Sequence, residues 1–207
     1  MSATSSVPAS VLDSVVLKPG ASVIAFSLWA SADDTSRGQA VAHLDESIGS
    51  SLDSERKFRA YLRHRYLSSA SDVVSEAQRW YPGWTPIVFH DVSVPRTFLG
   101  RMAAAGAQLV LMDRAQHAEP RMWRFLVADE PKVRRYLIRD VDTRFTERER
   151  CAVKEWLEGD AGFHVMRDHP GHAWPMMAGM WGGRRRLVGM RSLSHSTRTQ
   201  SFYGDQQ

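Results

Sequence analysis

The sequence lacks the features that mark secreted, membrane-spanning and disulfide-bonded proteins. Cys151 is the only cysteine in 207 residues, so no disulfide can form within the chain, and its expected position in a helix argues against a catalytic thiol. No apolar run approaches the roughly 18 residues that a membrane helix needs. The first 20 residues have neither the charged start nor the apolar core of a secretory signal. We therefore expect a cytoplasmic protein without a transmembrane segment, with a flexible arm at residues 1–20.

Composition also argues against the disordered and fibrous classes. Hydrophobic residues make up 43% of the chain and charged residues 24%, and both shares are ordinary for a globular protein. The length suits a single domain, which we expect at residues 21–207.

The excess positive charge lies at the C-terminal end. The chain carries 27 Lys and Arg against 23 Asp and Glu, a formal charge of +4. Residues 184–207 hold five arginines and one aspartate, so they account for the whole excess. A nucleic-acid-binding protein that uses the cluster Arg184, Arg185 and Arg186 is one function class to consider. It is disfavoured because residues 1–183 are neutral and no basic and aromatic residues interleave, so we expect no nucleic-acid partner.

Strand-like and helix-like segments alternate along the chain. Short apolar runs predict strands at residues 21–29, 85–90, 107–112, 133–138 and 162–166. Residues 30–53 are expected mainly as loop. Helical patterns begin at Ser54, separately after Ser71, and then after Pro95, Pro120 and Thr146. The last of these helices has a capping box formed by Thr146 and Glu149. This alternation predicts an α/β fold, a mostly parallel sheet with helices on both faces.

Several acidic residues follow the expected strands. Parallel sheets bind ligands outside the carboxyl ends of their strands, which makes Trp29, Asp91, Asp113 and the pair Asp140 and Asp142 candidates. In an extended segment Asp140 and Asp142 point to the same side. Carboxylates at one edge become useful when a cation such as Mg²⁺ or Mn²⁺ lies among them together with substrate phosphates. The same Asp-x-Asp spacing is also common in turns, where the carboxylates bond to the backbone.

Four segments in the second half of the chain carry a resemblance. They are residues 123–126 (WRFL), 139–142 (RDVD), 163–172 (FHVMRDHPGH) and 178–182 (AGMWG). The first half is similar more loosely, through residues 26–29 (FSLW) and 81–84 (YPGW), while residues 30–60 depart from the pattern. Together these segments resemble the GT-A type glycosyltransferases, which are nucleotide-diphospho-sugar transferases with a DxD motif.

The resemblance implies a Rossmann-like GT-A fold and a metal-dependent transfer of a sugar to a hydroxyl acceptor. The donor would be a UDP-sugar or GDP-sugar, and the acceptor a glycan or small molecule. Asp140 and Asp142 would hold Mn²⁺ or Mg²⁺ against the donor diphosphate. Ser27, Trp29 and Asp91 would face the nucleoside, with the Asp91 carboxylate accepting the imide N–H of a uracil.

Two arginines are implied in the same site. Arg124 or Arg139 would contact phosphates or orient the aspartates, since the guanidinium fork suits both tasks. For Arg124 the alternative is a salt bridge on a helix surface.

The resemblance also implies an acceptor side. Asp168 would be the base that deprotonates the acceptor hydroxyl, or a ligand of a sugar hydroxyl. His169, Gly179 and Trp181 would lie beside the sugar and acceptor. For Trp181, packing in a glycine-rich turn is an equal alternative to stacking on a sugar.

The chain stops at Gln207, where the resemblance implies further elements. A catalytically silent nucleotide-sugar-binding domain is therefore a second function class.

Overall fold

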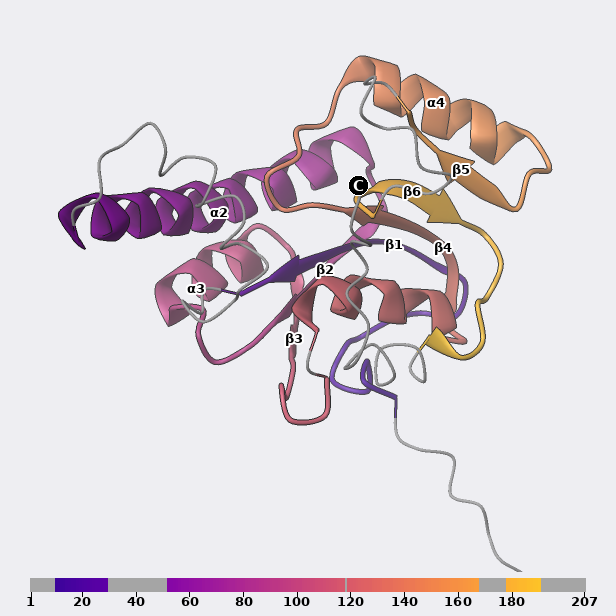
Figure 1. The fold of residues 1–207 in the computed structure, drawn as a ribbon. Helices are drawn as coiled ribbons and strands as arrows, with labels where there is room; N and C mark the ends of the chain where they lie inside the picture. Colours follow the sequence, from indigo (N-terminus) through magenta and orange to yellow (C-terminus); the bar gives the residue numbers. More distant parts are fainter. Residues whose placement is uncertain (1–9, 30–51, 118, 168–177, 191–207) are drawn as a thin grey trace, which may run out of the picture.

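The computed structural model describes residues 10–29, 52–117, 119–167 and 178–190, with the backbone alone for 52–65 (Figure 1). The expected loop at 30–53 lies almost wholly outside these residues. Of the expected arm, residues 10–20 are described, and they pack on the sheet through the buried side chains of Leu12 and Val15.

Six strands form one mixed sheet. In chain order they are β1 (Ala21–Leu28), β2 (Thr85–His90), β3 (Gln108–Leu111), β4 (Val133–Arg139), β5 (Phe163–Val165) and β6 (Met180–Gly183). Their spatial order is β3-β2-β1-β4-β6-β5. β1 to β4 are parallel, whereas β6 runs antiparallel to both β4 and β5. The predicted α/β class with a mostly parallel sheet is confirmed, and all five expected strands are present.

β6 occupies residues that the sequence suggested as a glycine-rich turn. Its two glycines are needed for packing rather than for turning. A Cβ on Gly182 would lie 2.7 Å from the Leu137 side chain, and a Cβ on Gly183 would overlap the Tyr136 ring. Only glycine therefore allows this strand to pair with β4 so closely.

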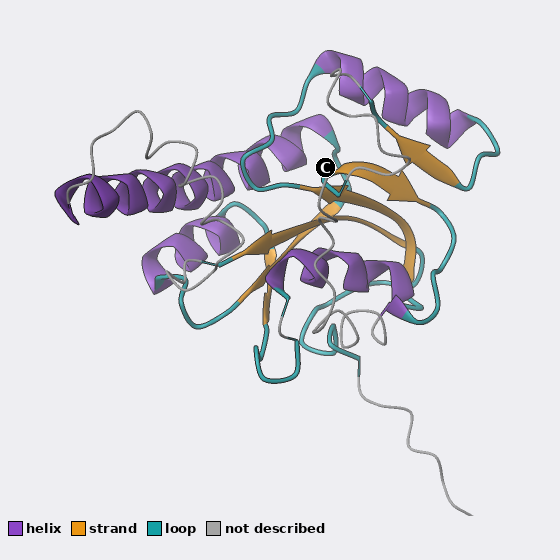
Figure 2. Cartoon of the chain, viewed as in Figure 1, coloured by secondary structure: helices purple, strands orange, loops and turns teal. Residues whose placement is uncertain are grey.

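The described helices are α2 (Leu52–Trp80), α3 (Arg96–Ala104), the 3-10 helix η1 (Pro120–Asp129) and α4 (Glu147–Glu158) (Figures 1 and 2). The two helical patterns expected from Ser54 and after Ser71 form one continuous helix, since residues 52–80 contain neither Gly nor Pro. No helix in the described part of the chain has the length and apolar character that crossing a membrane requires.

Thr146 caps α4 as predicted, and its hydroxyl accepts a hydrogen bond from the Glu149 N–H at 3.2 Å. The Glu149 side chain does not complete the predicted capping box. Its carboxylate forms an ion pair with the buried side chain of Arg139 instead.

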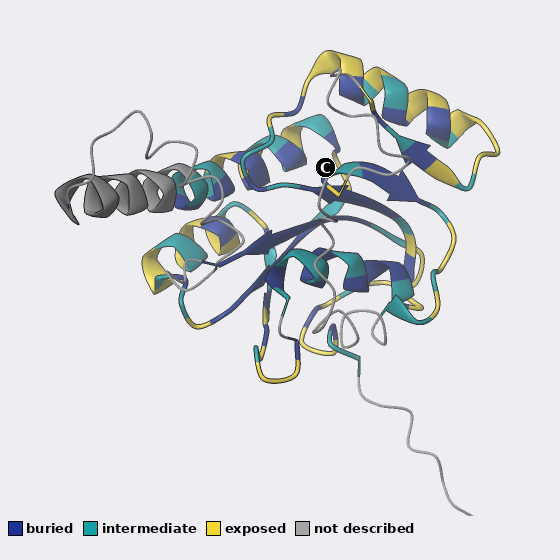
Figure 3. Ribbon diagram, in the orientation of Figure 1, coloured by how far each residue is buried: buried dark blue, intermediate teal, exposed yellow. Residues whose placement is uncertain are grey.

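Alternate residues of β1 enter two separate apolar cores. Ile24, Phe26 and Leu28 contribute to a core shared with α2, α3 and α4. Val23 and Ala25 contribute to a second core, shared with η1. The strands between these cores are almost wholly buried (Figure 3). The two-residue period of a strand thus decides which side chains face which helices.

The order of the strands creates one place where the chain reverses direction across the sheet. From β1 the chain moves outward to β2 and β3, and it then returns to place β4 on the other side of β1. In open α/β sheets such a switch leaves a crevice at the carboxyl ends of the two central strands, where ligands bind. Here those ends are Leu28 in β1 and Arg139 in β4.

Candidate functional site

Four residues that the sequence analysis proposed meet at the switch between β1 and β4. The Arg124 N–H in η1 donates to the Ser27 hydroxyl at the end of β1, at 3.0 Å. The Arg124 guanidinium donates through Nη1 to the Arg139 carbonyl at 3.3 Å and forms an ion pair with Oδ1 of Asp140. Arg124 therefore links η1 to the ends of both central strands.

Burial separates the roles of Arg124 and Asp140. The Arg124 side chain is 6% exposed, whereas that of Asp140 is 46% exposed. A buried arginine on a carboxylate fixes the direction of that carboxylate through a charge-assisted hydrogen bond. The alternative of a surface salt bridge does not describe Arg124, and the geometry matches the orienting role.

Gly179, in the turn that leads into β6, supports Asp140. A Cβ on Gly179 would lie 2.5 Å from Cγ of Asp140 and would overlap its Oδ2. The carboxylate thus occupies the space that any other residue at 179 would fill. Gly179 acts on this site through Asp140, in addition to any role beside the sugar.

Asp140 and Asp142 lie in a turn rather than in an extended segment. The Thr143 N–H donates to the Asp140 carbonyl at 3.2 Å, and Val141 is buried in the first core. The expectation that extended geometry places both carboxylates on one side is therefore wrong, because the chain turns directly after β4. Asp142 follows in this turn and is half-buried.

The position of Asp140 is compatible with a divalent cation that arrives with a phosphorylated substrate. Among the residues that the structure describes, no group of three or more His, Cys, Asp or Glu side chains could hold a metal. Mg²⁺ in phosphate-handling sites commonly has only one or two carboxylate ligands and takes the rest from phosphates and water. The half-exposed carboxylate of Asp140 suits that type of site.

Asp91 at the end of β2 is engaged by its own neighbours. It is 3% exposed, and its Oδ1 accepts from the Ser93 N–H at 3.0 Å and from the Ser93 hydroxyl. Its Oδ2 accepts from Nε of Arg114 at 2.5 Å. To bind the imide N–H of a uracil, the Asp91 carboxylate would have to give up at least one of these hydrogen bonds. In this structure Asp91 holds the loop after β2 together.

Arg139 does not point toward the switch. Its side chain is fully buried and its Nε donates to Oε1 of Glu149 in α4 at 2.7 Å. Consecutive residues at the end of a strand face opposite sides of the sheet, so Arg139 faces α4 while Asp140 faces η1. Arg139 does not reach a phosphate at Asp140, and it supports the site only through the backbone.

The two tryptophans expected near the substrate are packed in the second core. Trp29 is 7% exposed and meets Trp123 edge-on, with ring centroids 6.5 Å apart. Trp181 is 3% exposed and meets Tyr136 edge-on at 5.6 Å. For Trp181 the packing alternative describes this structure. Asp168 and His169 lie outside the described residues.

The basic cluster lies at the opposite edge of the sheet from Asp140, because β6 runs antiparallel to β4. Arg184 donates to the carbonyls of Gly159, at 2.8 Å, and Trp156, which end α4. Arg186 pairs with Asp129 at 3.1 Å. Arg184 and Arg186 therefore form hydrogen bonds and an ion pair within the domain, which weakens the case for nucleic-acid binding.

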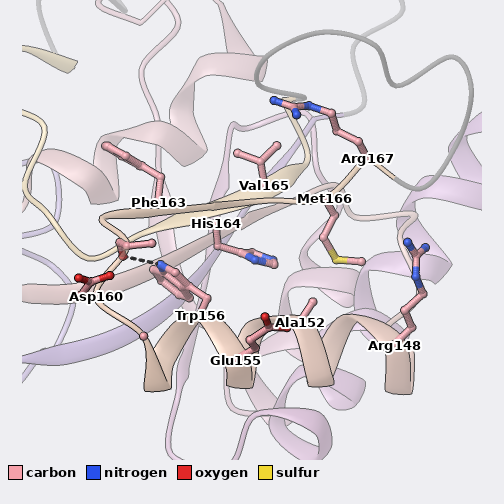
Figure 4. A pocket seen from close by; sticks show the side chains of 12 residues that line it. Arg148, Ala152, Glu155, Trp156, Asp160, Phe163, His164, Val165, Met166 and Arg167 are labelled. Atoms are coloured by element: carbon pink, nitrogen blue, oxygen red, sulfur yellow. Dashed lines mark hydrogen bonds between the residues drawn. The ribbon is translucent and has the colours of Figure 1, made fainter.

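A cavity of about 570 Å³ opens between α4 and β5 (Figure 4). His164 lies in its wall, stacked on Trp156 with ring centroids 5.7 Å apart. No described group is within hydrogen-bonding distance of its buried Nε2. Burial, helped by the positive charge of Arg139, lowers the pKa of His164 to about 4.

The low pKa of His164 predicts a loss of stability in acid. The unfolded chain binds a proton at this residue near pH 6.5, whereas the folded chain binds it only near pH 4. Stability should therefore fall as the pH drops through this window, by about 3 kcal/mol at its lower end. Urea denaturation of the wild type and His164→Phe from pH 8 to 4 measures this. The difference between the two proteins should be constant above pH 7 and should shift in favour of the variant below pH 6; parallel curves would contradict it.

Comparison of the chain with protein-family models, with curated proteins and with solved structures finds no match in any of the three.

Proposed function

We propose that the protein is a metal-dependent glycosyltransferase of GT-A architecture, with helices covering both faces of its sheet. It would move a sugar from a nucleoside diphosphate donor to the hydroxyl of a glycan or small molecule. The observation that carries the proposal is the Asp140 carboxylate at the switch between β1 and β4, half-exposed, oriented by buried Arg124 and seated on Gly179. The resemblance of residues 123–182 to this group supports it.

Each group at the site has a task in the proposed reaction. Asp140 and Asp142 would hold Mn²⁺ or Mg²⁺ against the donor diphosphate, and Arg124 keeps Asp140 in place. The cation supplies positive charge to the leaving diphosphate. The acceptor oxygen bonds to the anomeric carbon as the bond from that carbon to the diphosphate oxygen breaks. The hydroxyl proton passes to a base, for which Asp168 is our candidate, with His169 beside the acceptor.

A silent donor-binding domain is the second candidate. It is favoured by the burial of Ser27, Trp29, Asp91 and Trp181, which leaves few of the described groups open to a sugar. Donor binding without sugar transfer or donor hydrolysis would identify this alternative. In both cases Asp140 and Asp142 bind the metal and diphosphate.

Thermal unfolding with Mn²⁺ and a panel of UDP-sugars and GDP-sugars tests the proposal. A donor at a hundred times its dissociation constant should stabilise the protein by about 2.7 kcal/mol, which raises Tm by several degrees. Asp142→Ala should lose the metal-dependent part of this rise. Asp113→Ala is the matched control, since Asp113 follows β3 and its carboxylate accepts from the Ala115 N–H in a turn. Unchanged Tm with every donor, with and without metal, would refute the proposal.

A further inference from the structure

The cavity between α4 and β5 has the size of a small-molecule site. Its volume is about 570 Å³, which falls within the roughly 300–1,000 Å³ typical of ligand sites. In Figure 4 the His164 side chain extends from β5 toward α4. Asp140 faces η1 on the other side of the sheet, because it pairs with Arg124 there. The cavity is therefore separate from the candidate site at Asp140.

Both ends of α4 are anchored, and a small residue between the anchors leaves the cavity open. In the first turn of α4, Glu149 forms its buried ion pair with Arg139. At the other end, Arg184 donates to the carbonyls that end the helix. Between these anchors, Ala152 lines the cavity with only a methyl group. Since α4 cannot approach β5 without disturbing an anchor, the cavity is preformed, as ligand sites usually are.

The charged side chains that line the cavity balance one another. Two arginines and two acids are exposed along it: Arg148, Arg167, Glu155 and Asp160. A ligand with a net charge therefore gains little from this lining. The buried part of the lining includes Trp156, His164 and Met166. Aromatic rings and a thioether pack well against a further aromatic ring, so this lining suits an uncharged aromatic molecule.

His164 supplies a polar group that the rest of the described chain does not use. The residue is 9% exposed, and Nε2 has no described hydrogen-bond partner. A buried polar atom without a partner costs about 1–3 kcal/mol. The neighbouring Trp156 N–H, by contrast, donates to the Ala161 carbonyl at 2.9 Å. A ligand with a polar ring atom at His164 would remove this cost, whereas a hydrocarbon would not.

The charge state of His164 narrows the chemistry of such a ligand. Burial, with the positive charge of Arg139, lowers the pKa of His164 to about 4, so the imidazole is uncharged at neutral pH. An uncharged imidazole has one N–H donor and one acceptor nitrogen. A heteroaromatic ring offers N–H groups and acceptor nitrogens in one plane, which complements either tautomer.

We propose that the cavity between α4 and β5 binds a small uncharged heteroaromatic molecule. The ring of this molecule packs against His164 and Met166, and one of its polar ring atoms forms a hydrogen bond with the His164 imidazole. The proposal does not depend on the proposed sugar transfer, because the two sites lie on opposite faces of the sheet.

An NMR titration of the full, isotope-labelled chain with benzimidazole tests this site, at a pH of about 8 where the probe is uncharged. Backbone signals of residues 148–166 should shift, with a dissociation constant of about 0.1–1 mM, as expected for a ligand of this size. Ala152→Leu should abolish binding, because the longer side chain fills the cavity. His164→Phe keeps an aromatic ring and should weaken binding about fivefold, the scale of one lost hydrogen bond.

Lys154→Leu is the matched control. Lys154 lies on the same helix, but its side chain is 66% exposed and it is not among the residues that line the cavity. Its variant should bind benzimidazole as the wild type does. Donor binding with Mn²⁺ should be the same in Ala152→Leu as in the wild type, so this proposal and the proposed function can fail separately.

Three results would overturn the proposal. Binding that does not saturate below about 10 mM would show adventitious contact only. Unchanged affinity in Ala152→Leu would place the probe outside the cavity. Unchanged affinity in His164→Phe would show that the imidazole forms no hydrogen bond with the ligand, and this variant still decides the question if Ala152→Leu does not fold.

Discussion

Replacing Glu149 by alanine is expected to lower the free energy of unfolding by about 3–5 kcal/mol, the range seen when one partner of a buried ion pair is removed. Glu149 is 3% exposed and its partner Arg139 is fully buried. Without the carboxylate, the guanidinium would remain in the apolar core with its charge unbalanced. Moving it to water would require β4 to separate from α4, so the cost cannot be relieved locally.

The contacts around this pair explain why the effect should be large. Nη1 of Arg139 donates to the carbonyls of Ile138, at 2.7 Å, and Trp181, at 2.9 Å. Tyr81 at the end of α2 donates its hydroxyl to Glu149 at 3.3 Å. Burial and the negative charge of Glu149 raise the pKa of Tyr81, which keeps it protonated as a donor. One carboxylate thus connects α2, α4, β4 and β6.

Urea denaturation at pH 7 measures the loss. Glu147→Ala is the matched control, since Glu147 lies in the same first turn of α4 but pairs with Arg150 at the surface, and it should cost no more than about 1 kcal/mol. Replacing both partners, with Arg139→Met and Glu149→Leu together, should recover much of the stability because no unpaired charge is left. A loss below 1 kcal/mol for Glu149→Ala would show that the pair does not hold α4 to the sheet.

The strands β1 and β2 were predictable because burial on both faces makes them nearly continuous apolar runs. They appear within one residue of the expected bounds, and so does β4, whose apolar residues are interrupted by arginines. β6 was not predictable, since Gly182 and Gly183 are poor strand formers in isolation. They are required there by the side chains of Leu137 and Tyr136, which belong to a strand more than 40 residues earlier in the sequence.

The position of the candidate site could be predicted from the sequence, but the residues that contact Asp140 could be predicted less well. Asp140 could be placed because it follows an apolar strand, and strand ends at a switch meet at one edge. The sequence also indicated that Arg124, and not Arg139, faces Asp140. Arg139 and Asp140 are consecutive residues at a strand end, so their side chains must face opposite sides of the sheet. The role of Glu149 was hidden because its spacing from Thr146 already fitted a capping box.

Replacing Gly179 by alanine is expected to reduce kcat/KM of the proposed sugar transfer about 100-fold, the scale of a displacement of about 1 Å in a catalytic group. The new methyl group would overlap Oδ2 of Asp140. The carboxylate would have to rotate away from Arg124, which cannot follow because η1 buries it. Metal and diphosphate would then lose a correctly directed ligand although both aspartates are still present.

Two measurements together identify this effect. The rise in Tm with Mn²⁺ and donor should shrink in Gly179→Ala toward that of Asp140→Asn, while the Tm without ligands should fall only modestly, as for a small overpacking defect. Gly100→Ala in α3 is the matched control, because a Cβ there meets nothing within 4 Å and both donor binding and activity should be unchanged. If Gly179→Ala keeps donor affinity and kcat/KM within about twofold of the wild type, Asp140 does not depend on this contact.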